Sequence, residues 1–130
     1  MDATQALREL MEVSSQVTAA VVLDADGAVL ASAPESAGEA LAASTKELVQ
    51  AASGLGADGR DVTRVEVELG EGALFVVREG GRTVGATTGP KPTSGLVVYD
   101  LRTCAQAIRT EEPKRRRAPR KPKAPKEPTE

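Results

Sequence analysis

The sequence predicts a mixed α/β fold of the α+β type, in which helices pack on a five-stranded antiparallel sheet. Helical and strand-like segments follow one another in the order helix, strand, strand, helix, three strands, helix. Short turns that contain glycine separate neighbouring strands, as in antiparallel hairpins. The last 20 residues carry no large apolar side chain, so we expect one domain over residues 1–110 and a tail over residues 111–130.

The N-terminal segment is predicted to be a helix followed by a hairpin. Asp2 and Gln5 fit a capping pattern, because an N-cap carboxylate accepts a bond from an amide three residues later. An apolar stripe at helical spacing follows, formed by Leu7, Leu10, Met11 and Ser14. Residues 17–23 and 28–33 are predicted strands. The Asp-Ala-Asp-Gly sequence between them is typical of a tight turn.

A second helix is predicted after Pro34, which ends the hairpin. Ser36 and Glu39 are expected to form a capping box, and Gly54 is expected to cap the other end of a helix that reaches about Ser53. One face of this helix is formed by Leu41, Thr45, Leu48, Val49 and Ala52.

Three strands and a last helix complete the domain. Residues 62–69 alternate, with Val65, Val67 and Leu69 on one face and Arg64, Glu66 and Glu68 on the other. Residues 73–78 and 83–88 are predicted strands, separated by the Gly80-Gly81 turn. Thr93 or Ser94 is expected to cap a final helix that ends before Pro113. Its apolar stripe is formed by Val97, Leu101, Cys104, Ala105 and Ile108.

The formal net charge of −2 conceals two oppositely charged parts. Residues 111–130 hold eight Lys and Arg against four Glu, which leaves a domain with nine basic and 15 acidic residues. The tail is predicted to be disordered, because it cannot bury enough apolar surface to offset the entropy of ordering it. We expect a cytoplasmic protein, since the chain lacks a secretory signal, a membrane-spanning run and paired cysteines.

The sequence contains no motif that predicts a catalytic site. Residues 54–59 match G-x-G-x-x-G, but a predicted helix precedes them and a strand follows, the reverse of a dinucleotide-binding turn. The chain contains no histidine, and Cys104 lies on an apolar helix face, where a core residue is expected rather than a nucleophile. Asp24 and Asp26 lack the later ligands of a calcium loop. We therefore expect no enzyme, no cofactor and no metal.

The basic tail is a separate candidate site. Its cations could bind the phosphates of nucleic acid or an anionic membrane surface, through Lys114, Arg115, Arg116, Arg117, Arg120 and Lys121. A tail that only keeps the protein soluble is an equally good interpretation. No aromatic residue is present in the tail to stack on bases.

Two segments resemble the roadblock (dynein light-chain) family, in its bacterial branch of regulators of Ras-like GTPases. Residues 19–32, AAVVLDADGAVLAS, look like that family's first hairpin, and residues 93–102, TSGLVVYDLR, look like its last loop and helix. The resemblance implies a homodimer, or a dimer with a paralogue, that binds a small Ras-like GTPase without contributing a catalytic centre. The alternative is a dimerisation module whose basic tail binds nucleic acid or an anionic membrane.

The resemblance also implies where two subunits meet. In roadblock proteins the second helix and the third strand form the dimer contact, which corresponds here to Leu41, Leu48, Val49, Thr63, Val65 and Val67. An edge strand presents unpaired backbone groups, so self-pairing along residues 62–69 is physically reasonable. Proline at Val65 is expected to remove a backbone donor and to dissociate the dimer.

Overall fold

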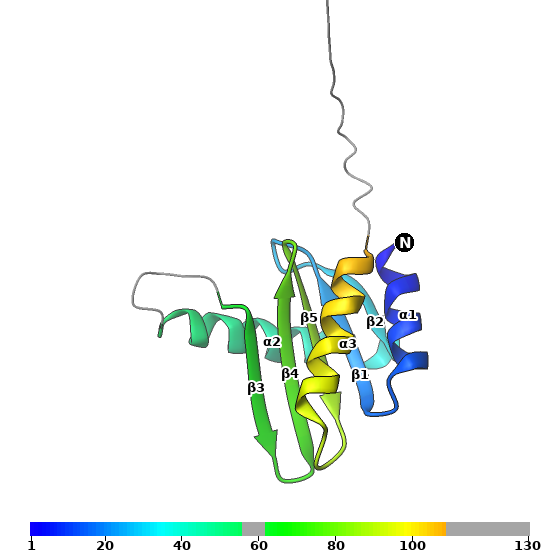
Figure 1. Ribbon diagram of the computed structural model, residues 1–130. Coiled ribbons are helices and arrows are strands. Elements are labelled where there is room, and N and C mark those ends of the chain that lie inside the picture. The colour runs from blue at the N-terminus through cyan, green and yellow to red at the C-terminus, as the bar shows by residue number, and fades with distance from the viewer. Residues whose placement is uncertain (56–61, 109–130) are drawn as a thin grey trace, which may run out of the picture.

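The computed structural model describes residues 1–55 and 62–108, and its elements follow the predicted order (Figure 1). The helices are α1 (Ala3–Val13), α2 (Gly38–Ser53) and α3 (Ser94–Ala107), with a short 3₁₀ turn η1 (Glu35–Ala37) before α2. The strands are β1 (Val17–Leu23), β2 (Val29–Ala33), β3 (Arg64–Leu69), β4 (Gly72–Glu79) and β5 (Arg82–Thr88). They form one antiparallel sheet in the order β2-β1-β5-β4-β3, which confirms the predicted fold class.

The sheet lies between two layers of helix (Figure 1). Helices α1 and α3 pack side by side on one face, where Phe75, Val22 and Leu101 belong to the larger apolar core. Helix α2 covers the other face alone, over a smaller core that contains Val21 and Leu74. Because successive residues of a strand point to opposite faces, β4 contributes Phe75 to one core and Leu74 to the other.

The first helix and the first hairpin form as predicted. Asp2 caps α1, with its Oδ1 accepting a hydrogen bond of 2.8 Å from the amide of Gln5. In the hairpin, Asp24 Oδ1 accepts bonds of 2.9 Å from the amides of Asp26 and Ala28. Gly27 adopts a φ of 89°, a conformation that a residue with a Cβ rarely tolerates.

The predicted capping box at the start of α2 is wrong. Ser36 lies inside the 3₁₀ turn η1, and Ala37 takes the N-cap position with no side-chain hydrogen bond. A capping serine needs an extended backbone, whereas the chain here is already helical before α2 begins. The helix instead starts at Gly38, which is pressed so closely against Ser32 of β2 that an added Cβ would lie 2.8 Å from the Ser32 Cβ.

The ends of α2 and α3 agree with the prediction in position but not in capping chemistry. Gly54 follows the last residue of α2, yet its φ of −68° is helical rather than left-handed. Thr93 occupies the N-cap of α3 without a side-chain cap bond. Its backbone amide instead donates a bond of 2.6 Å to Oε1 of Gln16, which ties the start of α3 to the segment before β1.

Helix α2 approaches the sheet through a contact between Thr45 and Gly85 of β5. A Cβ built on Gly85 would lie 3.1 Å from both the Cβ and the Cγ2 of Thr45, so only glycine fits beneath the helix. Thr45 is fully buried, and its hydroxyl oxygen finds no hydrogen-bond partner within residues 1–55 and 62–108. An unsatisfied buried hydroxyl costs about 1–3 kcal/mol of folding free energy.

We therefore expect Thr45→Val to raise the free energy of unfolding by about 1 kcal/mol, because it removes the unsatisfied hydroxyl and keeps the branched shape. Urea denaturation followed by circular dichroism measures the change. Thr103→Val, at an exposed position of α3, is the matched control and should change stability far less. A loss of stability in Thr45→Val would contradict this expectation, and would mean either that the hydroxyl has a partner in solution or that a methyl group does not fit against Gly85.

Candidate functional site

Strand β3 is an edge of the sheet, and its backbone leaves hydrogen-bonding groups open. In the described part of the chain it pairs only with β4. The amide of Arg78 donates a bond of 3.0 Å to the carbonyl of Thr63, so the Thr63–Arg78 pair is hydrogen-bonded. Bonded and non-bonded pairs alternate along an antiparallel ladder, so Val65 and Val67 also direct their backbone groups toward β4.

The backbone groups of the intervening residues, Arg64, Glu66 and Glu68, consequently point away from the sheet. We call these three residues the outward positions of β3. A second strand could pair with them without displacing any existing bond. The sequence alone does not reveal this set, because the direction of each amide depends on the register with β4 and not on the alternation of side chains.

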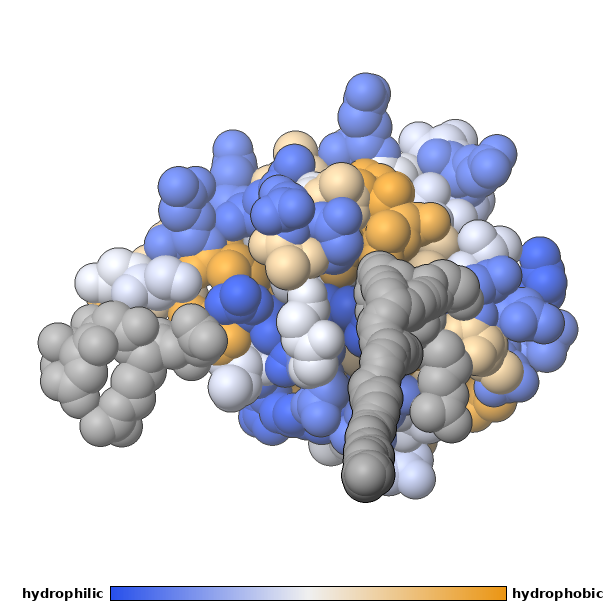
Figure 2. All heavy atoms as spheres, turned by 90° about the horizontal axis from the view of Figure 1, so that it is seen from above, coloured by the Kyte–Doolittle hydropathy of each residue, from blue (hydrophilic) through white to orange (hydrophobic). Residues whose placement is uncertain are grey.

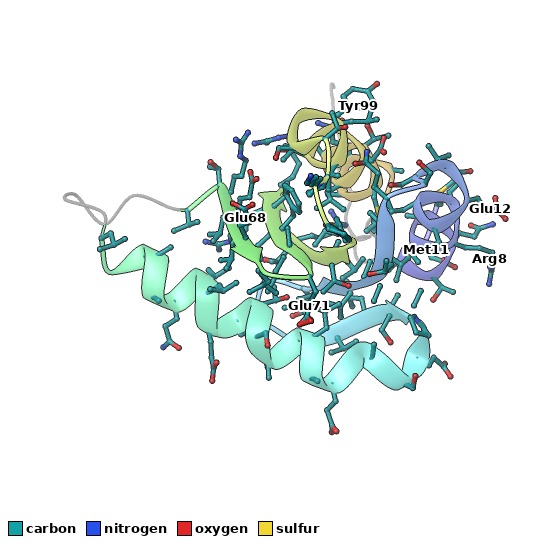
Figure 3. The ribbon with its side chains drawn as sticks, turned by 90° about the horizontal axis from the view of Figure 1, so that it is seen from below. Arg8, Met11, Glu12, Glu68, Glu71 and Tyr99 are labelled. Atoms are coloured by element: carbon teal, nitrogen blue, oxygen red, sulfur yellow. The ribbon has the colours of Figure 1, made fainter. Side chains whose placement is uncertain are left out.

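The two faces of β3 have different chemistry. Val65 and Val67 are half-buried on the α2 side, where Val67 packs with Leu48 against the smaller core. The side chains of the outward positions are exposed on the opposite face, where Glu68 lies away from α2 (Figure 3). Glu66 Oε2 accepts a bond of 2.7 Å from the hydroxyl of Ser94, which fixes the middle of β3 to the start of α3.

Helix α2 extends past β3, so that its C-terminal end projects beyond the edge of the sheet (Figures 1 and 3). The exposed side of this helix carries small and polar residues: Ala40, Ala43, Ser44, Glu47, Gln50 and Ala51. The projecting helix and the open strand therefore lie at the same edge of the molecule.

The structure brings together only part of the residue set that the family resemblance implied for a dimer contact. Leu48 of α2 and Val67 of β3 both pack against the smaller core, and Val65 is half-buried on the same face of β3. Leu41 is 7% exposed and belongs to the smaller core of the subunit itself, so it can add little surface to a contact. Thr63 is exposed just before β3.

Val49 faces a different feature, a cavity of about 450 Å³ between α2 and the β1–β2 turn. Lys46 and Arg78 also line this cavity, together with Asp24 and Asp26. The tail residues Lys114, Arg115, Arg116, Arg117, Arg120 and Lys121 lie outside the described residues, as do residues 56–59 of the glycine motif.

The other edge of the sheet, β2, is less suited to pairing. It spans five residues, its register with β1 shifts beside Leu23, and Pro34 follows it directly. Bulges and prolines at an edge strand hinder its pairing with another chain. A groove of about 530 Å³ separates β2 from α1, with Arg8 and Met11 on its helical wall (Figure 3).

Seen from the end that holds the N-terminus, polar side chains cover most of the molecule, and apolar surface is confined to small areas (Figure 2). Within the described ranges no helix is long and apolar enough to cross a membrane. Nor do these residues contain a cluster of three His, Cys, Asp or Glu able to hold a metal ion.

Cys104 is a core residue, as the helical pattern predicted. Its side chain is 4% exposed in the larger core. Burial, and to a smaller extent the nearby charge of Glu9, raises the pKa of the Cys104 thiol from 9.0 to about 11. A thiolate nucleophile needs the opposite shift, so both the burial of Cys104 and its raised pKa disfavour a catalytic role.

The raised pKa makes a prediction about alkaline stability. The unfolded thiol loses its proton near pH 9 and the folded thiol near pH 11, so the stabilising contribution of the neutral thiol is complete below pH 9 and is lost between these values. We expect the unfolding free energy of the native chain to fall more steeply between pH 9 and pH 11 than that of Cys104→Ala. Equal slopes in denaturant titrations of the two proteins would contradict this.

Known proteins share this architecture. The sequence model of the Roadblock/LC7 domain matches residues 3–84. No curated protein matches the sequence itself. Among solved structures, the Roadblock/LC7 domain from Streptomyces avermitilis is 26% identical, with a TM-score of 0.71 over 82% of this chain and 94% of that chain.

Two more distant structures share the fold. Myxococcus xanthus MglB is 15% identical, with a TM-score of 0.60 over 80% of this chain and 85% of its own. The gliding protein MglB from Thermus thermophilus is 19% identical, with a TM-score of 0.59 over 82% of this chain and 84% of its own. The family match runs from α1 to the start of β5 and the structural matches cover most of the described fold, so this chain belongs to the Roadblock/LC7 domain family.

Proposed function

We propose that this protein is a dimeric, non-catalytic regulator or scaffold for a small Ras-like GTPase. The observation that carries the dimer is the open edge of β3, where a regular six-residue strand with three outward positions lies beside the projecting end of α2. A relative of the same fold, MglB, is described in a tetrameric arrangement, which supports self-association within this fold.

The GTPase partner is inferred from the family and from the chemistry of the chain. Roadblock proteins of the bacterial branch regulate Ras-like GTPases, and a regulator can bias the switch regions of its partner without a catalytic group of its own. The described residues carry no metal-ligand cluster, and their single cysteine is buried. These observations support the proposal that the protein acts by binding.

Isologous pairing of two β3 strands would extend the five-stranded sheet across the dimer. On one side of the joined sheet the two α2 helices would meet over Leu48, Val65 and Val67. Burial of the half-exposed valines would then continue the smaller core of each subunit into the contact.

Two proline variants distinguish an effect on dimerisation from an effect on the stability of the subunit. Glu66→Pro removes an amide that points out of the sheet, so we expect a folded monomer. Val65→Pro removes an amide that points toward β4, so it should cost about 1–3 kcal/mol of subunit stability instead. Val65→Pro, which is expected from the sequence to dissociate the dimer, would therefore also weaken the pairing of β3 with β4.

Sedimentation velocity and thermal unfolding of both variants provide the measurements. Glu66→Gln, which keeps the outward amide, is the control for loss of the side-chain charge and should remain largely dimeric. A dimer that survives Glu66→Pro without change would exclude pairing along β3.

A second experiment tests the GTPase. We expect the purified dimer to bind a small Ras-like GTPase, and to prefer either its GDP-bound or its GTP-analogue-bound state, because a regulator must distinguish the two states to bias them. Titration calorimetry measures binding and phosphate release measures turnover.

The Glu66→Pro variant reports whether the effect requires the dimer, and a chain that ends at residue 110 reports whether it requires the basic tail. The absence of binding in both nucleotide states would contradict the GTPase assignment. Binding of the full chain to nucleic acid or anionic vesicles alone, at about 50 mM salt, would favour a role for the tail instead.

A further inference from the structure

The outward positions of β3 carry an ordered charge pattern, positive at Arg64 and negative at Glu66 and Glu68. The same three residues direct their backbone groups toward any added strand and expose their side chains on one face of the sheet. Charge and backbone pairing are therefore coupled, because any strand that bonds to this edge sets its own side chains opposite these charges.

A second copy of β3, related by a two-fold axis, can pair in only a few registers. Outward positions must lie opposite outward positions, since only they have open backbone groups. An axis at Arg64 sets two arginines opposite each other, and an axis at Glu68 sets two glutamates opposite each other. An axis at Val67 sets Glu66 opposite the partner's Glu68 twice.

Two registers remain. An axis at Glu66 forms two Arg64–Glu68 pairs but opposes the two copies of Glu66. An axis at Val65 forms two Arg64–Glu66 pairs and leaves no like charges directly opposite. Opposite charges across a strand pair are stabilising, and like charges directly opposite are destabilising, so the axis at Val65 is the best of the set.

We propose that two copies pair along β3 with Val65 on the two-fold axis and Arg64 opposite the partner's Glu66. This inference rests on the proposed dimer and specifies its register. Glu68 then lies opposite the partner's Val62 and diagonal to the partner's Arg64. On the α2 side, Thr63 lies opposite the partner's Val67, so β-branched side chains meet along the axis.

The bond between Ser94 and Glu66 supports this arrangement. The 2.7 Å contact orients the Glu66 carboxylate before a partner arrives and leaves its other oxygen available to a guanidinium. Self-pairing would then discriminate among related chains, because a strand with like charges at both positions would be disfavoured on this edge.

Cysteine cross-linking tests the register directly. Because Val65 directs its backbone toward β4, two copies at the axis would form a non-bonded pair with Cα atoms about 4.5 Å apart. That separation lies within the range of about 4.4–6.8 Å that disulfides span. We expect Val65→Cys to form a covalent dimer under mild oxidation, and Val67→Cys, set opposite the partner's Thr63, to remain largely uncross-linked.

The native chain is the control for Cys104, which is buried. Cross-linking through Glu66→Cys in preference to Val65→Cys would overturn the proposal in favour of the axis at Glu66. Preferential cross-linking through Val67→Cys would overturn it in favour of the axis at Val67.

Charge reversal tests the proposed pairs. In the Arg64→Glu homodimer each pair holds two negative charges, and in the Glu66→Arg homodimer each pair holds two positive charges. We expect the dissociation constant of each homodimer to be about tenfold higher than that of the native dimer. Mixing the two variants restores both opposite-charge pairs in a heterodimer. We expect native mass spectrometry of the mixture to show predominantly heterodimer, with affinity near the native value.

Ser94→Ala serves as the matched control for the bond that Glu66→Arg also removes, and it should leave the dimer largely intact. If the variants mix at random, or if neither reversal weakens the dimer, the register is wrong. A native chain that is itself monomeric at micromolar concentration would overturn the dimer along with the register. A native dimer whose Val65→Cys variant forms no cross-link would overturn the register alone.

Discussion

Both faces of the central sheet carry apolar side chains, and each face needs a helical layer to exclude water. Two helices, α1 and α3, cover the face that contains Phe75, and this layer produces the larger core. A single helix, α2, is left for the other face, and it lies over β1, β2 and β5 before it projects past β3. This unequal division leaves one side of β3 only half covered.

Helix α2 packs closely on the sheet because it covers one face alone. One helix must cover a whole face of the sheet, so it approaches the strands where Gly85 has no side chain. The approach buries Thr45 without a hydrogen-bond partner within the described ranges, which is a local cost. Direct packing of Leu41 and Ala42 on Val21 and Leu23 accompanies it.

The same three residues of β3, Arg64, Glu66 and Glu68, carry its charged face and its open backbone groups. The valines of β3 direct their backbone groups toward β4 and their side chains toward α2. The charged residues direct their backbone groups away from β4 and expose their side chains on the opposite face. The edge therefore combines open backbone hydrogen-bonding groups with a charge pattern that restricts which strand can pair with it. At the opposite edge, the register of β2 with β1 shifts and Pro34 follows the end of the strand, so the two edges of the sheet are not equivalent.

Sequence alone determined the element order, the strand alternation and the core positions of α3, because these depend on residue periodicity and on turn residues such as Gly27. It also limited the chemistry, since a chain without histidine and with one apolar-face cysteine offers few catalytic groups. The tertiary structure decided what depends on contacts between distant segments. Those contacts replaced the Ser36 cap by a 3₁₀ turn against β2, and they placed Leu41 in the subunit core. They also set the direction of each β3 amide, because that direction follows from the pairing of Thr63 with Arg78, which no local pattern encodes.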